Sequence, residues 1–417
     1  MLTSLLERLT TLVSKYFLIG YFIPVMVFGF LSGAIFYHSF TWFREWAKPE
    51  ISGTVKIFDA GAVLVGLSVV SYLLSTVSVF LREALEGKHL IERLPPLDLY
   101  LRSRQEAKLK NFQNQYSQAR NEYAAILEGK LEWQQELAKS SKTGRSDAKD
   151  RNAYDPSNSA AAKELTRLRE EIASSRPPTA ASLRKATDEM KTELAKNDSS
   201  VVDTVTGRKP LWEDRGNLIR IFEDAEDAWA ARELHAFSEI QSGFGIGYVA
   251  STAMGNVAQS MQAYALTRYQ MNLNTFWGRM QPGMQGNKDF YSQLQDTKVQ
   301  LDFLVSCTWL CASSSVLWMT TLLISGSSAI LFAAAAIGGP LASYFLYFLA
   351  TKNYSVFAEL VRTGVDLFRF QLLQALHIAL PNGIRDERAT WAALQKVSTF
   401  GSEVVDLSYQ HGPRSQL

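Results

Sequence analysis

Four carboxylates close together in the middle of the chain are the first candidates for metal chemistry. Glu223, Asp224, Glu226 and Asp227 fall within one short stretch, and carboxylate oxygens are preferred ligands of divalent cations. A calcium loop of the EF-hand type also needs ligands at alternating positions and a glycine at its sharp turn. Neither is present here, so we expect no metal at this cluster.

The other residues with chemical potential form no complete catalytic set. The glycine-rich stretch "SGFGIGYVAS" (242–251) lacks both the GxGxxG pattern and the lysine of a phosphate-binding loop. The five histidines form no HExxH motif, and no Ser-His-Asp arrangement can be placed on one face. Cys307 and Cys311 lie in an apolar run, where small apolar packing residues are expected. The sequence predicts neither an enzyme nor a bound cofactor.

Four long stretches without Asp, Glu, Lys or Arg define the architecture instead. The first contains 25 residues, which as a helix would span ~37 Å, enough to cross a bilayer. We predict an all-α membrane protein with four transmembrane helices in two hairpins. The four stretches are Tyr16–Phe40, Gly61–Leu81, Phe303–Ile324 and Ala329–Ala350.

The basic residues that flank these stretches predict the orientation. Short loops rich in Lys and Arg face the cytoplasm, which places both termini and the large central region there. The basic side carries Arg8, Lys15, Arg82, Lys88, Arg93, Lys352 and Arg362, and the other side carries Arg44, Lys48 and Lys56.

Five regions follow from this topology. Residues 1–15 place leucines on one stripe, which predicts a helix lying on the membrane surface or, alternatively, a continuation of the first crossing. Residues 83–302 predict a helical cytoplasmic region, and about 99–195 of it an arm with roughly heptad apolar spacing, typical of a coiled coil. The remaining regions are the two transmembrane hairpins, 16–82 and 303–351, and C-terminal cytoplasmic helices at 352–417.

The stretch "RYQMNLNTFWGRM" (268–280) combines arginines with aromatic residues before the third crossing. Aromatic rings beside arginines are favoured at the inner membrane interface, and we expect this segment to couple the cytoplasmic region to that crossing. The alternative is internal packing, with the arginines paired to the acids around Glu223. The candidate coupling residues are Arg268, Tyr269, Trp277, Arg279, Arg220 and Glu223.

Hydroxyl side chains gather in the third charge-free stretch. They would suit a weakly polar pore, or they would join helices through hydrogen bonds. The residues are Ser313, Ser314, Ser315, Thr320 and Thr321.

Three stretches resemble a group of bacterial inner-membrane proteins with four crossings. They are "GYFIP" (20–24), "GNLIRIFED" (216–224), which fits a GN-x-x-R-x-x-E pattern, and "ALTRYQMNLNTFWGRM" (265–280), which fits RY, six residues, then FW-x-R. The tail "DLFRFQLLQALHIALP" (366–381) is similar to that group's ending. The chain departs from the pattern at Gln270, Asn272 and Gly278, where glycine, an acid and proline are expected. The resemblance implies a bacterial inner-membrane protein and carries no activity.

The absence of charged residues from the membrane stretches limits the classes of function that the protein can have. They carry no ionisable Asp, Glu, Lys or Arg, which argues against proton relays and voltage sensors. A net charge of +2 without a clustered basic face gives no indication of nucleic-acid binding. We expect first a homo-oligomeric channel or pore regulated by its cytoplasmic helices. The alternatives are a membrane-anchored scaffold or sensor that binds a cytoplasmic partner through the arm, and a stator-like subunit of a motor complex.

Overall fold

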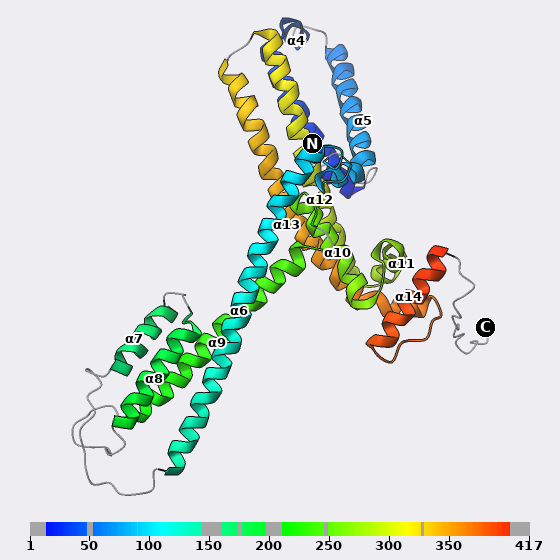
Figure 1. The fold of residues 1–417 in the computed structure, drawn as a ribbon. Helices are drawn as coiled ribbons and strands as arrows, with labels where there is room; N and C mark the ends of the chain where they lie inside the picture. The colour runs from blue at the N-terminus through cyan, green and yellow to red at the C-terminus, as the bar shows by residue number, and fades with distance from the viewer. Residues whose placement is uncertain are drawn as a thin grey trace. The chain divides into compact units, whose positions relative to one another are not determined.

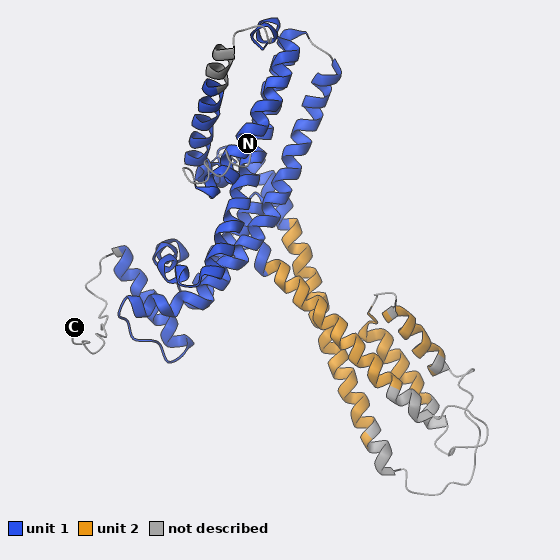
Figure 2. Cartoon of the chain, turned by 180° about the vertical axis from the view of Figure 1, so that it is seen from behind, with its two compact units in different colours: residues 1–106, 241–417 blue, residues 107–240 orange. Residues whose placement is uncertain are grey.

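The computed structural model describes residues 14–47, 53–89, 91–143, 160–173, 177–196, 211–245, 249–326 and 329–400. Within these ranges all regular structure is helical, which confirms the predicted all-α class. The chain divides into two compact units (Figure 2): unit 1 is Met1–Glu106 with Gln241–Leu417, and unit 2 is Ala107–Ile240. The predicted surface helix at 1–15 lies almost entirely outside the described residues.

Four segments of unit 1 are long and apolar enough to span a membrane, as predicted. They are Lys15–Ser39, Gly61–Leu85, Lys288–Ser325 and Ala329–Ala375. The second belongs to α5 (Gly53–Leu85), and the last two are α12 (Lys288–Ser325) and α13 (Ala329–Ala375) (Figure 1). Both α12 and α13 continue beyond their charge-free runs without a break, so each carries a polar extension of the same helix.

The first span is a composite helix because of a proline. It consists of α2 (Lys15–Phe17), the π-helical turn η1 (Leu18–Phe22) and α3 (Ile23–Ser39), and a short helix, α4 (Thr41–Trp46), follows it. Pro24 has no N–H to donate to the carbonyl four residues before it. The Ile23 N–H bonds to the Leu18 carbonyl instead, which gives the wider π turn.

The most extensive helix–helix contact in the described chain joins α12 and α13, which run side by side in Figure 1. Helix α12 ends at Gly326, whose φ of +60° is the left-handed conformation that glycine adopts without strain. Close to this end, a Cβ at Gly339 would come within 2.4 Å of the Ser315 Cβ. Glycine at this position therefore permits the close approach of the two helices.

Unit 2 is built from four helices around one apolar core. These are α6 (Pro95–Thr143), which begins in unit 1, α7 (Ala160–Ala173), α8 (Ala180–Lys196) and α9 (Leu211–Gly243), which ends in unit 1. In α6 the buried residues Ala119, Ile126 and Trp133 recur at seven-residue intervals, and α9 adds Phe222 and Trp229. The unit therefore extends beyond the predicted arm of about 99–195, because α9 supplies one side of the core. In sequence, the mixture of aromatic residues, acids and arginines in α9 differs from the composition of the arm, which separated the two.

The rest of unit 1 surrounds a second core. Helices α10 (Ala253–Tyr269), α11 (Leu273–Gln285) and α14 (Ile384–Phe400) pack against α13 and the first turns of α12. Phe276, Met280 and Trp391 are fully buried at their centre. Gln270, which ends α10, has a φ of +62°. The position where the resembling pattern has glycine is thus one whose backbone conformation favours glycine.

Candidate functional site

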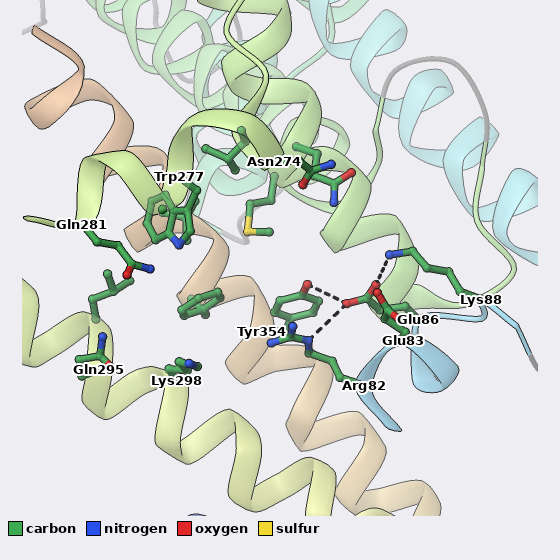
Figure 3. A pocket seen from close by; sticks show the side chains of 17 residues that line it. Arg82, Glu83, Glu86, Lys88, Asn274, Trp277, Gln281, Gln295, Lys298 and Tyr354 are labelled. Atoms are coloured by element: carbon green, nitrogen blue, oxygen red, sulfur yellow. Dashed lines mark hydrogen bonds and ion pairs between the residues drawn. The ribbon is translucent and has the colours of Figure 1, made fainter. Parts of the chain in front are cut away.

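A cavity of about 480 Å³ at the end of α5 is the candidate functional site (Figure 3). Its walls come from α5 and the turn after it, and from α10, α11, α12 and α13. Arg82 lies in the last turn of the α5 span, Lys298 precedes the charge-free run of α12, and Tyr354 follows that of α13. The cavity therefore lies where three apolar spans give way to charged sequence.

A buried carboxylate holds one wall of this cavity together. Glu86 has only 4% of its side chain exposed. It accepts hydrogen bonds from Lys88 Nζ at 2.7 Å and from the Tyr354 hydroxyl at 2.9 Å, and Arg82 Nε lies 3.8 Å away. These dashed contacts in Figure 3 join α5 to α13. A buried carboxylate is tolerated because it is paired and hydrogen-bonded.

The turn that presents Glu86 depends on two glycines. Gly87 has a φ of +92°, a conformation that L side chains rarely adopt. A Cβ at Gly255 in α10 would lie 2.1 Å from the Glu86 carbonyl oxygen, which is impossible without moving the backbone. The N-terminus of α10 can therefore approach this turn only with glycine at that position.

Several polar groups that line the cavity have no hydrogen-bond partner in the described part of the chain. Arg82 Nε is buried and bonds to no acceptor, since the nearest Glu86 oxygen is too distant. Lys298 makes no ion pair with any described residue. Four carboxamides share this property: Gln262, Asn274, Gln281 and Gln295. The cavity thus combines cationic donors with amide donors and acceptors.

Helix α11 brings one of the predicted coupling residues into the cavity. Trp277 is half-buried and lines the wall beside Asn274 and Gln281. Asn272 caps this helix by accepting a hydrogen bond from the Asn274 N–H at 3.0 Å. The departures from the resembling pattern at Gln270 and Asn272 both lie in the short link that sets the direction of α11.

Tyr269 belongs to a second polar cluster, which does not line the cavity. The Tyr264 and Tyr269 hydroxyls each donate a hydrogen bond of 2.7 Å to one carboxylate oxygen of Asp366 in α13. Arg369 lies over the Tyr269 ring at 4.4 Å and forms a 2.6 Å ion pair with Glu387 of α14. The cluster therefore joins α10, α13 and α14.

Burial and the Asp366 carboxylate raise the pKa of both tyrosines. For Tyr264 and for Tyr269 the largest cause is burial, followed by the hydrogen bond to Asp366. The Arg268 guanidinium lies 5.6 Å from the centre of the Tyr264 ring and donates a 3.2 Å hydrogen bond to its hydroxyl. Arg268 is thus directed to this cluster, while its own side chain stays exposed.

A buried arginine completes the polar interior of unit 1. Arg362 of α13 forms a 2.9 Å ion pair with Glu359 and donates to the hydroxyl of Ser260 in α10. Its guanidinium also reaches the carbonyls of Gln241 and Ser242 at the end of α9. The sequence placed Arg362 among the flanking basic residues, whereas in the structure it lies between helices and is only 6% exposed.

The remaining predicted coupling residues lie apart from the cavity. Arg279 donates a 2.9 Å hydrogen bond to the Ser398 hydroxyl of α14 and lies over the Phe276 ring. Glu223 belongs to unit 2, where it pairs with Lys130 at 3.7 Å, and Arg220 is exposed on the same helix. Arg268 and Arg279 thus have partners within unit 1.

Four of the five predicted hydroxyl groups of α12 are hydrogen-bonded to backbone carbonyls. Ser315 donates to the Ala335 carbonyl of α13 at 2.8 Å, which joins the two helices. Ser313, Thr320 and Thr321 bond within their own helix at 3.2, 2.8 and 2.8 Å, and Ser314 is buried. Of these contacts, the one made by Ser315 links α12 to α13, and the other three stay within α12.

No group of His, Cys, Asp or Glu suited to a metal ion is found among the described residues. In comparisons with known proteins, no protein family, no curated protein and no solved structure matches the chain. The cavity, the polar clusters and unit 2 are therefore the features that bear on the function.

Proposed function

We propose that the protein is a membrane-anchored scaffold in which unit 2 binds a partner protein on the cytoplasmic side. The observation that carries this proposal is that unit 2 has a complete apolar core of its own. Ile126, Leu168, Leu183 and Leu218, one from each of its four helices, are fully buried. A region with its own core folds as a separate recognition module, as domains do.

The hydroxyl contacts of α12 favour an anchor over a channel. A pore lining must offer free polar groups to ions or water. In α12 the Ser315 hydroxyl serves the contact with α13, and Ser313, Thr320 and Thr321 serve their own backbone. The Trp309 and Trp318 indoles likewise bond the Leu81 carbonyl and the Ser32 hydroxyl at 3.0 Å. Of these groups, Ser315, Trp309 and Trp318 join different helices of the membrane spans, which supports the role of an anchor.

A groove on unit 2 supplies a surface for the partner. A cavity of about 350 Å³ lies between α6 and α9, and Trp229 forms its floor. The Trp229 indole donates a 2.9 Å hydrogen bond to the Pro178 carbonyl, and Arg232 lies over its ring at 5.1 Å. Buried tryptophan beside arginine is the composition enriched at the energetic centres of protein interfaces. Gln118 and His235 complete the rim.

Photo-crosslinking from the groove in intact cells tests this function. A photoreactive amino acid at Gln118 should give discrete crosslinked species of higher mass. The matched control is the same amino acid at Arg184 of α8, which is exposed on unit 2 but lies outside the groove. Identical crosslinking from both positions, or none from Gln118, would contradict a partner site in the groove.

The nature of the crosslinked species decides between partners. Adducts that contain a different protein, and that disappear in the Gln118→Trp variant, support the scaffold. Adducts formed only with a second copy of this chain would favour the homo-oligomer expected from the sequence. The Gln118→Trp variant, whose larger side chain fills the groove, should keep its helical content, because Gln118 is exposed.

A further inference from the structure

We propose that the cavity at the end of α5 binds a phosphate ester that carries free hydroxyl groups, as in the headgroup of an anionic glycerophospholipid. This goes beyond the scaffold function, because no residue of unit 2 lines the cavity. The ligand class follows from three features: the charge of the walls, the amides beside them, and the level of the cavity along the spans.

The walls carry three cationic and two acidic side chains, Asp302 of α12 lies within electrostatic range of Arg82 and Lys298, and several of the cationic donors are spare. Glu86 accepts hydrogen bonds from Lys88 and Tyr354, and Glu83 pairs with His89 at 3.3 Å. The Lys88 ammonium has two further N–H groups, and Arg82 Nε is buried without an acceptor. Lys298 faces the same space from α12 (Figure 3). A phosphate oxygen satisfies donors of this kind through charge-assisted hydrogen bonds.

The carboxamides select for hydroxyls beside the phosphate. An amide offers both donors and an acceptor, and a hydroxyl group can pair with either. Gln262, Asn274, Gln281 and Gln295 surround the space while bonding to no described residue. A trimethylated amine, as in phosphatidylcholine, has neither donor nor acceptor for them. A headgroup that ends in a glycerol diol supplies both.

The position of the cavity favours a lipid as the source of this chemistry. Arg82, Lys298 and Tyr354 mark the charged ends of three spans, and phosphates of a bilayer lie at this level. Basic pockets between transmembrane helices at such a level bind anionic headgroups. A soluble phosphorylated polyol has the same chemistry, so the test separates the two sources.

Native mass spectrometry of the full-length, delipidated protein in detergent tests the proposal. The protein is titrated with phosphatidylglycerol and, separately, with phosphatidylcholine, and bound lipid is counted. Phosphatidylglycerol should bind at least tenfold more tightly. Lys298→Gln should weaken its binding by about tenfold, because one charge-assisted hydrogen bond is lost. Lys352→Gln is the matched control: this lysine is also exposed near the end of a span, but it lies outside the cavity. It should change binding by less than about twofold.

Two further measurements test the role of the amides and the source of the ligand. Gln295→Ala should weaken binding of phosphatidylglycerol more than that of phosphatidic acid, which lacks the glycerol headgroup. If soluble glycerol 3-phosphate displaces the lipid, the cavity accepts the free ester, and if it does not, the lipid is the ligand. Circular dichroism and size-exclusion chromatography confirm that each variant is folded. Equal binding of both phospholipids, or equal losses in Lys298→Gln and Lys352→Gln, would overturn the proposal.

Discussion

Both units bury apolar side chains between helices, but they differ in how many charged side chains they bury. In unit 2, four helices meet through aliphatic and aromatic side chains, and every described ion pair has at least one partner with a fifth or more of its side chain exposed. Unit 2 buries the acid Glu164, which pairs with the exposed Arg167 and Lys185. In unit 1, more charged groups enter the interior. The Arg369–Glu387 pair is 15% and 6% exposed, and Glu86 and Arg362 are buried as well.

The difference in buried charge affects how strictly each interior fixes the positions of its helices. Apolar cores give stability but tolerate changes of partner and register, whereas a buried charge is costly wherever it lacks its counter-charge. Unit 1 must hold its helices at fixed heights relative to the ends of the spans. We infer that the pairs made by Glu86, Asp366 and Glu387 fix how far α5, α10, α13 and α14 are shifted along one another. In its proposed role, unit 2 needs only to stay folded while its surface contacts a partner.

Trp133→Ala should have the largest effect, and only in unit 2. Removing a fully buried tryptophan from a core costs about 3–5 kcal/mol. Hydrogen–deuterium exchange should accelerate in peptides from α6 to α9 and stay unchanged in α10 to α14. Leu131→Ala, at an exposed position nearby on the same helix, should change neither set. Faster exchange in both units would show that they fold as one cooperative body.

Glu387→Ala should produce the reverse pattern. The buried Arg369 loses its counter-charge, at a cost of about 3 kcal/mol. Exchange should accelerate in α10, α13 and α14 while unit 2 is unaffected. The double variant Arg369→Met with Glu387→Met should recover most of the loss, because no unpaired charge remains. A double variant as unstable as the single one would contradict the register argument.

Tyr269→Phe should have a moderate effect that depends on pH. The hydrogen bond to the Asp366 carboxylate contributes about 1.5–3 kcal/mol. Since burial and this bond raise the pKa of Tyr269 in the folded state, its contribution is complete below the unfolded tyrosine pKa of about 10 and is lost as pH rises above it. Chemical unfolding between pH 7 and 11 should therefore show a steeper loss in the native protein than in Tyr269→Phe. Parallel curves would assign no role to this hydroxyl.

Lys130→Ala should have the smallest effect. Its ion pairs with Glu226 at 2.8 Å and Glu223 at 3.7 Å are partly exposed, and pairs of this kind contribute about 1 kcal/mol or less. The loss should shrink further in 1 M salt, where screening is strong. A large loss that persists at high salt would show that unit 2 also depends on internal charge.

The spans were predictable from sequence because an uncharged, apolar run of about 20 residues matches the thickness of a bilayer and is rare in soluble helices. The helices of unit 2 were also predictable in part. The roughly heptad apolar spacing predicted for the arm includes Tyr123 and Ile126, and both pack in the core. Trp133 and the partnership with α9 were missed, although Leu218, Phe222, Ala225 and Trp229 follow the same alternation of three and four residues.

The buried charges of unit 1 were not predictable. Glu86, Asp366 and Glu387 look like ordinary surface acids in sequence. Glu86 and Asp366 have partners 268 and 102 residues away, and Glu387 pairs with Arg369 of the preceding helix. Trp277 and Tyr269 were singled out for their residue type, which reflects interfacial preference. Only the structure separates them, with Trp277 in the cavity and Tyr269 in the tyrosine–aspartate cluster.

The proposal that the spans anchor and do not conduct is tested most directly by recording from the purified full-length protein in planar lipid bilayers. The account predicts no conductance above the protein-free baseline under any applied voltage or membrane tension, with or without phosphatidylglycerol. Discrete single-channel openings whose amplitude changes in Ser313→Val or Thr320→Val would contradict it, because those hydroxyls would then face a water-filled pore.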